Sequence, residues 1–413
     1  VTRIPKRLFR FRHALVQEAA YETVLLKQRT RLHTAVANFL EATQPERVED
    51  LADHLLKGRQ GERAVPYLVA AGERAARSYA VPTAIDRLET ALDLMDDATD
   101  PGLLRRALET LGQAKQFAFD IEGAAAAYER LRREGDRRDN MEMTISGLNK
   151  GGLLRGFFFD DRDAALDDIA QAEELARNVE DRTGLVESCV SQCYLRTGHG
   201  EFEQVEYYMS EVTRLGADLN DPDSVLFGMT HLSNTLVMLT RFDEALQEAE
   251  KTLAYAREHG NLHYQAEIQR WAIPICHLRN GDVAAATAAL EEGMEIAVQI
   301  GDRASEAFCA YLQGRIAMDR GYLQDALSLS RRSQAAADAT GVPASRALGA
   351  CAVGTCYFTI GGTLTEAALQ LHEEALQLVD MPSGSSLASP VWAEVGHCVL
   401  ASGKVDDAKH LFH

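Results

Sequence analysis

The chain has 413 residues, 46% hydrophobic and 25% charged, so it can bury a large core and is neither disordered nor collagen-like. Its formal net charge of −19 argues against binding nucleic acid or anionic lipid, because phosphate groups require clustered cations. The sequence contains no apolar run long enough to span a membrane and no signal-peptide pattern, so we expect a cytoplasmic protein without membrane contacts.

The first 45 residues differ in charge from the rest of the chain. Residues 1–33 hold eight Lys or Arg and two Glu, a net charge of +6, which leaves −25 for residues 34–413. Apolar residues recur at helical spacing in this segment, at Leu15, Ala19, Val24, Leu25, Leu32, Val36, Phe39 and Leu40. The spacing predicts basic amphipathic helices over residues 1–45, which on pattern alone could be a cap on the array that follows.

The order of residues in this segment carries a more specific signal. The matching residues are Phe11, His13, Leu15, Glu18, Ala20, Tyr21, Arg31, Leu32, His33, Ala37, Leu40 and Glu41. Together they resemble the segment that closes the winged-helix region of STAND-type (AAA-like) signalling ATPases, just before a TPR-like sensor arm. In bacteria such proteins often carry a class III adenylate or guanylate cyclase domain or a LuxR-type DNA-binding domain. The resemblance implies that residues 1–45 connect this chain to an ATPase core in cis, whose acidic surfaces the cations could face.

From residue 46 onward, a short pattern repeats at a nearly constant step. Its anchor residue recurs every 40 or 41 residues, at Ala84, Ala124, Ala165, Val205, Ala245, Ala286, Ala326, Ala367 and Ala408. Each anchor begins an amphipathic helix. A second helix lies upstream, with a small residue such as Gly72, Gly112 or Gly354 at its closest-packed position. Such self-similarity indicates a repeat fold of helical hairpins.

The periodic pattern resembles the tetratricopeptide repeat (TPR) over roughly residues 46–413. It departs from the consensus of roughly 34 residues by its longer period and its missing closing Pro, as in the long-helix superhelices of large signalling ATPases. We predict an all-α, right-handed superhelical solenoid of about nine hairpins whose last repeat is truncated. Gly301 and Gly341 are expected to end helices in a left-handed conformation, and Asp302 to cap the next helix.

The sequence offers little that could support catalysis. It has no Gly-x-x-x-x-Gly-Lys-Ser/Thr loop, no His-Glu-x-x-His, no Gly-x-Ser-x-Gly and no Cys-x-x-Cys pair. Asp160, Asp161 and Asp163 could suggest a metal site, but the start of a helix also favours carboxylates. The seven cysteines are expected to be small buried residues rather than redox sensors. We predict a non-enzyme without metal or cofactor, and ATP with Mg²⁺ is implied only for the attached domain.

The candidate site is the inner surface of the predicted superhelix, which the first helix of each TPR-like hairpin lines. The middle repeats place there Tyr194, Phe227, His231, Asn234, Trp271, Phe308, Tyr311 and Arg315. Aromatic side chains with a few polar groups suit a peptide or small molecule, although each could equally pack between repeats. Pro274 is expected to kink its helix beside Trp271 and open the groove. If the site forms, Trp271 would stack on the ligand, and Asn234 and Arg315 would hydrogen-bond to it.

These patterns favour a non-catalytic sensor and protein-interaction module. Binding of an effector, a peptide or a small molecule, would shift the module between arrangements that restrain or release an attached nucleotide-dependent domain. The alternative is a pure protein–protein interaction scaffold for assembly. An enzyme in its own right is a weaker third hypothesis, and a homo-oligomer is compatible with the sequence.

Overall fold

The computed structural model describes residues 18–19, 21–77, 80–118, 120–159, 161–197, 199–362, 365–379 and 388–403. Regular structure in these ranges is helical throughout, and they contain no strand. None of the helices in these ranges combines the length and apolar character that crossing a membrane requires. Packing divides the chain into two compact units, residues 1–147 and 148–413, each with its own core.

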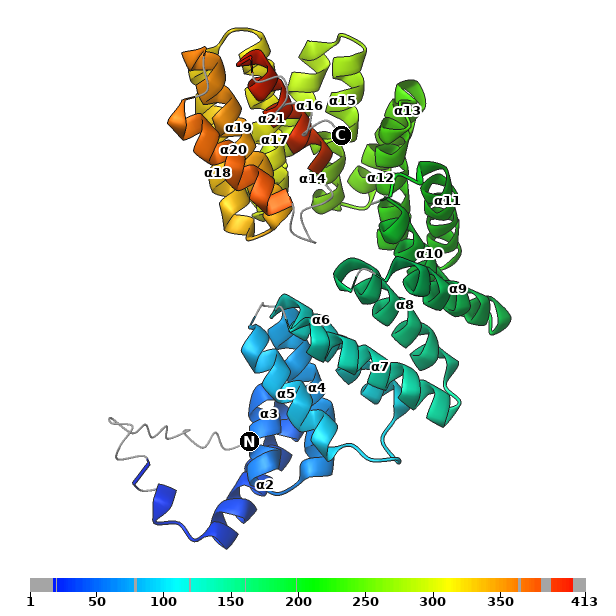
Figure 1. Cartoon of the computed structure of the whole chain (residues 1–413). Helices are drawn as coiled ribbons and strands as arrows, with labels where there is room; N and C mark the ends of the chain where they lie inside the picture. Colours follow the sequence, from blue (N-terminus) through cyan, green and yellow to red (C-terminus); the bar gives the residue numbers. More distant parts are fainter. Residues whose placement is uncertain are drawn as a thin grey trace, which may run out of the picture. The chain divides into compact units, whose positions relative to one another are not determined.

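The first unit is a series of helices in which neighbours along the chain pack on each other (Figure 1). Its helices are α2 (Leu26–Thr43), α3 (Val48–Lys57), α4 (Gly61–Arg77), α5 (Val81–Leu94), α6 (Pro101–Phe117) and α7 (Ile121–Arg138), followed by the start of α8 (Met141–Phe158). Leu68, Leu88 and Leu108 are fully buried in its core. The helix α2 packs on α3 and buries Ala37 and Leu40. The domain boundary predicted between residues 45 and 46 stays a prediction.

The second unit continues the same hairpin pattern. After the end of α8 its helices are α9 (Arg162–Asn178), α10 (Arg182–Thr197), α11 (Phe202–Asp218), α12 (Pro222–Met238), α13 (Phe242–Glu258), α14 (Leu262–Arg270), α15 (Ala272–Arg279), α16 (Val283–Ile300), α17 (Arg303–Asp319), α18 (Leu323–Thr340), α19 (Pro343–Gly361), α20 (Glu366–Val379) and α21 (Ala388–Ala401). The first helices of successive hairpins also touch, as α14 touches α17, α17 touches α19, and α19 touches α21. These first helices therefore lie side by side.

The turns between helices form as the sequence predicts. Gly301 (φ 72°) and Gly341 (φ 68°) end α16 and α18 in the left-handed conformation, which costs glycine little because it has no Cβ. Asp302 caps α17, since its Oδ1 accepts the backbone N–H of Ser305 at 3.0 Å. These signals separate α16 from α17 and end α18 before α19 begins.

The anchors of the repeat pattern are the tight contacts between helices. The seven from Ala84 to Ala326 are at most 2% exposed. A Cβ added to Gly72 would lie 2.6 Å from Leu88 Cγ, so the absence of a side chain there allows the two helices of the hairpin to approach. The predicted all-α solenoid of helical hairpins is confirmed.

One predicted anchor is wrong by a single residue. Ala367 is exposed on α20, whereas Ala368 is 0% exposed and takes the place of an anchor. The next buried residue of α20, His372, lies four positions after Ala368, just as Leu88 lies four after Ala84. Adjacent alanines cannot be told apart by residue type, so only packing resolves this register. The last anchor, Ala408, lies outside the described residues.

Candidate functional site

Seven of the eight predicted site residues lie on first helices of hairpins in the second unit, and Trp271 lies at a break in such a helix. Tyr194 is on α10, Phe227, His231 and Asn234 are on α12, Trp271 joins α14 to α15, and Phe308, Tyr311 and Arg315 are on α17. The structure brings them together as two groups. The four residues of α10 and α12 line a cavity, and the other four form a row of contacts that continues to α21.

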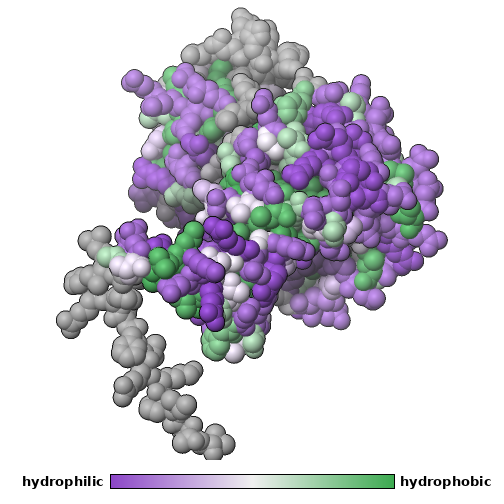
Figure 2. All heavy atoms as spheres, turned by 90° about the horizontal axis from the view of Figure 1, so that it is seen from below, coloured by the Kyte–Doolittle hydropathy of each residue, from purple (hydrophilic) through white to green (hydrophobic). Residues whose placement is uncertain are grey.

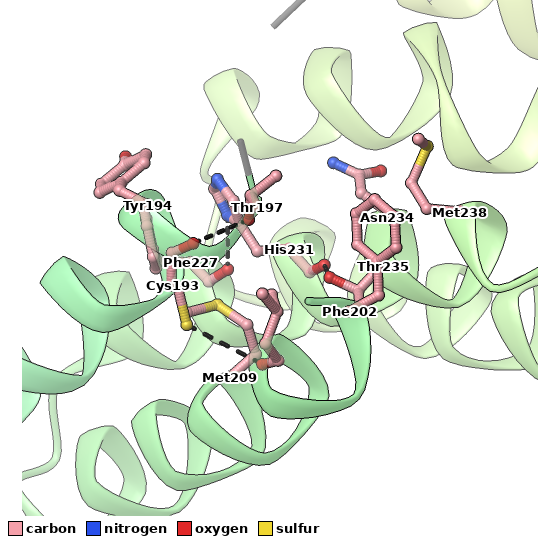
Figure 3. A pocket seen from close by; sticks show the side chains of 11 residues that line it. Cys193, Tyr194, Thr197, Phe202, Met209, Phe227, His231, Asn234, Thr235 and Met238 are labelled. Atoms are coloured by element: carbon pink, nitrogen blue, oxygen red, sulfur yellow. Dashed lines mark hydrogen bonds between the residues drawn. The ribbon is translucent and has the colours of Figure 1, made fainter. Parts of the chain in front are cut away.

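The cavity lies between α10, α11 and α12 and has a volume of about 180 Å³ (Figure 3). Tyr194, Phe227, His231 and Asn234 all line it, so this half of the predicted set shares one site. Sequence reasoning missed the wall contributed by α11, which includes Phe202 and Met209. Those residues belong to the second helix of a hairpin. The prediction considered only first helices as the lining of the inner surface, so it did not include them. The lining is mainly aromatic and thioether groups, which suit an apolar guest.

Aromatic contacts hold the shape of one side of this cavity. The rings of Phe227 and His231 stack with centroids 4.0 Å apart, and Tyr194 meets both edge-on at 6.1 and 6.3 Å. His231 Nδ1–H donates to the carbonyl oxygen of Phe227 at 2.9 Å, which leaves Nε2 as an acceptor. Burial lowers the pKa of His231, so the ring is neutral near pH 7.

Asn234 supplies the most distinctive polar atom of the site. Its Oδ1 is buried and has no hydrogen-bond partner among the described residues. An unsatisfied buried acceptor of this kind costs about 1–3 kcal/mol. Figure 3 shows the Asn234 side chain beside Phe202, Thr235 and Met238. The cavity therefore combines an apolar volume with one acceptor that lacks a donor.

The kink predicted at Pro274 is confirmed, and it lies at Trp271. The helix α14 ends at Arg270, and Trp271 has φ −129° and ψ −76°, outside the helical region, before α15 begins. Pro274 has no N–H to donate to the carbonyl of Arg270, which accounts for the break. Trp271 then packs edge-on against Phe308, with ring centroids 5.1 Å apart, and the Arg270 guanidinium lies 5.8 Å from the Phe308 ring.

The other two predicted residues have an internal partner, Glu394 on α21. Tyr311 Oη donates to Glu394 Oε1 at 2.6 Å, and Arg315 forms an ion pair with the same oxygen at 2.9 Å. Thr355 Oγ1 of α19 donates to Oε2 at 3.2 Å. Burial, and then the Glu394 carboxylate, raise the pKa of Tyr311 well above its ordinary value. Arg315 therefore has its charge balanced within the chain, and no sequence motif marked Glu394 as its partner.

The described residues of the acidic cluster lie at the start of a helix, and the cysteines lie in the core. In the described part of the chain, no group of three or more His, Cys, Asp or Glu could hold a metal ion. Asp163 lies in the first turn of α9 and Asp161 immediately before it, where the helix dipole favours carboxylates, while Asp160 lies outside the described residues. All seven cysteines are free and buried. Burial raises the pKa of Cys189 and Cys309 to about 12, as expected for packing residues.

Comparison with known proteins places the fold among tetratricopeptide-like helical solenoids. The apo form of RapI is 14% identical, with a TM-score of 0.58 over 84% of this chain and 97% of that chain. The apo form of the quorum sensor NprR from B. thuringiensis is 10% identical, with a TM-score of 0.55 over 86% of this chain and 98% of that chain. A STAND signal transduction ATPase with a tetratricopeptide repeat sensor, from Pyrococcus horikoshii, is 11% identical, with a TM-score of 0.55 over 91% of this chain and 57% of that chain. At such low identity these likenesses show the fold alone.

Sequence comparison adds one partial relative. An uncharacterised protein of Rhizobium meliloti (strain 1021) is 37% identical over 119 residues, which is 27% of this chain and 12% of that protein. The matched part is thus a small fraction of a much longer relative. No family model matches the chain.

Proposed function

We propose that the chain is a non-catalytic regulatory module that binds an effector on the inner face of its second unit. The observation that carries this proposal is the cavity beside Asn234, where an apolar volume and a buried acceptor without a donor occur together. Trp271 and Phe308 contact each other in the next two hairpins along the chain. A ligand that fills the cavity and extends toward Trp271 would use both groups of aromatic side chains.

The size of the cavity favours a peptide with one large apolar side chain as the effector. An apolar cavity of about 150 Å³ holds benzene, so about 180 Å³ accommodates one aromatic or branched aliphatic side chain. A backbone N–H of the peptide would then donate to Asn234 Oδ1. A small molecule with the same combination of an apolar group and a donor is the other form that this effector could take.

The contacts around Glu394 suggest how binding could reach the rest of the molecule. Phe308 packs edge-on against Tyr311 at 6.0 Å, and Tyr311 in turn holds Glu394 of α21. A ligand that moves Phe308 would alter the support of Glu394 and with it the position of α21. An effector with higher affinity for one arrangement would shift the population toward that arrangement.

The partner that this module would control is a domain attached to it in the same chain. The residues that resemble the end of a STAND winged-helix region, and the STAND sensor among the structural neighbours, support an ATPase core in cis as the controlled partner. ATP and Mg²⁺ would belong to that core, and a cyclase or LuxR-type output would lie elsewhere in the longer protein. A pure interaction scaffold is the alternative, and it would not require the cavity to bind an isolated ligand.

The test is a thermal-shift screen against pooled metabolites and short peptides with one Phe, Leu or Trp each. A ligand at 100 times its dissociation constant stabilises the folded state by about 2.7 kcal/mol, which raises the melting temperature measurably. We expect a shift in the wild type that Trp271→Ala and Asn234→Ala both reduce. Trp392→Ala is the matched control, because Trp392 is 39% exposed on α21. If no pool shifts the wild type, or if both site variants respond like the control, the scaffold alternative replaces this proposal.

A further inference from the structure

Three side chains of the first unit form a short chain of hydrogen bonds. His33 lies on α2 and His54 on α3, and their Nδ1 atoms are 2.8 Å apart. Tyr21 lies in the segment before α2, and its Oη is 2.9 Å from His33 Nε2. The Tyr21 and His33 rings meet edge-on, with centroids 5.9 Å apart. We call Tyr21, His33 and His54 the histidine chain.

The short distance between the two Nδ1 atoms limits how many protons the histidine chain can hold. A neutral imidazole has one N–H and one acceptor nitrogen, so either His33 donates to His54 or His54 donates to His33. One added proton is tolerated, because His33 with both nitrogens protonated donates to His54 Nδ1 and to Tyr21 Oη. A second added proton places an N–H on both Nδ1 atoms, so neither accepts. The closed arrangement therefore holds at most one added proton, whereas two separated rings hold two.

The charged groups near the histidine chain do not favour protonation. Lys57 lies on α3, one turn after His54, and burial, then His54 and Lys57, lower the pKa of His33. The Arg29 guanidinium lies 4.6 Å from the centre of the Tyr21 ring. Among the described residues, neither imidazole of the histidine chain forms an ion pair with a carboxylate. The carboxylates of α2 and α3 have arginine partners instead, in the pairs Glu41–Arg63, Glu49–Arg74, Asp50–Arg47 and Asp53–Arg87.

The histidine chain ties the segment before α2 to both helices. Within that segment, Arg29 donates from Nε to the Val24 carbonyl at 2.6 Å and from Nη2 to the Glu22 carbonyl at 2.7 Å. His33 contacts Tyr21 on one side and His54 on the other, so a rotation that separates it from His54 also moves Nε2 away from Tyr21. Both imidazoles are only partly buried, and the surface in Figure 2 is mainly hydrophilic, so solvent protons reach the pair.

We propose that the histidine chain is a pH-sensitive latch, which holds residues 21–25 against α2 at neutral pH and releases them in acid. Separated histidines have pKa values of about 6.5, and the closed pair excludes the second proton. Closing is therefore complete above pH 6.5 and weakens as the pH falls below it, because the open arrangement binds more protons. One excluded proton lowers the equilibrium constant for closing about 30-fold between pH 7.5 and pH 5.

The latch stands apart from the proposed effector site. Its residues all belong to the first unit, whereas the cavity beside Asn234 belongs to the second. In the proposed function, residues 21–25 are part of the connection to the attached domain, so their release in acid would loosen that connection. The latch itself needs neither an effector nor the attached domain, so either proposal can fail without the other.

The first experiment measures proton binding by each histidine of the whole chain. Exchange of the imidazole Cε1–H with deuterium depends on protonation, and mass spectrometry of peptides assigns it to His33 and His54 separately. We expect the two residues to take up protons in separate steps, with at least one step about one pH unit or more below the ordinary value of 6.5. Independent rings would both titrate near that value.

The second experiment measures release of the segment by amide exchange in peptides that cover residues 21–29. Val24 N–H, which donates to the Tyr21 carbonyl at 3.2 Å, is one of the protected amides. After correction for the intrinsic exchange rate, we expect protection to fall about 30-fold between pH 7.5 and pH 5.

Variants assign this loss of protection to the histidine chain. His54→Asn keeps a side chain that can donate or accept near the Nδ1 position but does not titrate, so the loss between pH 7.5 and pH 5 should disappear. Tyr21→Phe removes the hydroxyl and should lower protection at pH 7.5 while the two proton-uptake steps stay separate. The controls are His277→Asn on α15 and Tyr322→Phe, at a residue that is 59% exposed, and both should behave like the wild type.

Three results would overturn the proposal. The first is uptake of both protons near pH 6.5 by His33 and His54 in the wild type, which requires no variant to be folded. The second is a loss of protection in acid that is as large in His54→Asn as in the wild type. The third is unchanged protection of residues 21–29 in Tyr21→Phe, with circular dichroism showing that the variant is folded.

Discussion

The buried His372 should make the stability of the α19–α20 hairpin depend on pH. Its side chain is 2% exposed, and neither ring nitrogen has a hydrogen-bond partner among the described residues. It packs against Gly354, where an added Cβ would lie 2.6 Å from His372 Cδ2. Burial lowers its pKa from 6.5 to about 4. Between pH 6.5 and pH 4, His372 is therefore protonated in the unfolded chain but not in the folded chain.

The size of the effect follows from the linkage between proton binding and unfolding. Above pH 6.5, His372 is uncharged in both states and does not lower the free energy of unfolding. As the pH falls from 6.5 toward 4, the free energy of unfolding decreases, because only the unfolded state is protonated in that interval. At about 1.36 kcal/mol for each pH unit, the loss amounts to about 3 kcal/mol. Below pH 4 both states are protonated, and this residue adds no further dependence.

The variant His372→Leu isolates this contribution, because leucine fills the equivalent position in α5, where Leu88 packs on Gly72. The free energy of unfolding is measured by amide exchange in α20 for the variant and the wild type at pH 7.5 and at pH 4. Between these two pH values, we expect the wild type to lose about 3 kcal/mol more than the variant. A difference between His372→Leu and wild type that stays constant with pH would refute the reasoning.

Three further predictions concern packing. Gly112→Ala would place its Cβ 2.3 Å from Tyr128 Cε1, so it should lower the free energy of unfolding by about 1–3 kcal/mol in a denaturant titration. Gly314→Ala has its nearest contact at 3.2 Å, so it should be neutral or slightly stabilising in the same titration. Ala368→Leu should destabilise by about 1–3 kcal/mol and Ala367→Leu by less than about 0.5 kcal/mol; equal effects would contradict the corrected register. The seven thiols should stay unreactive toward a thiol reagent until the chain unfolds, and rapid labelling of the native chain would contradict their burial.

Much of the fold could be predicted because the repeat pattern states the same constraint many times. An anchor such as Ala245 allows close helix contact, and Gly301 ends its helix in the left-handed conformation that glycine adopts readily. The failure at Ala367 shows the limit of this reasoning. Where two alanines are adjacent, only the packing of the neighbouring helix decides which one is buried.

The candidate site was predictable only in part. Periodicity placed Tyr194 and Asn234 on the inner face, and the structure brings both to one cavity. Periodicity could not indicate that Met209 of α11 lines the cavity or that Glu394 of α21 forms an ion pair with Arg315. Met209 lies on the second helix of its hairpin, and Glu394 lies two hairpins beyond Arg315, so a pattern read within one repeat shows neither contact.

The most direct test of the proposed site uses tryptophan fluorescence. The chain has two tryptophans, so Trp392→Phe leaves Trp271 as the single reporter on the inner face. Titration with each active pool from the thermal-shift screen should change Trp271 emission saturably, and Asn234→Ala should weaken that response. Unchanged Trp271 emission, together with a response from Trp392 in the Trp271→Phe variant, would show that the ligand binds elsewhere and would contradict the account.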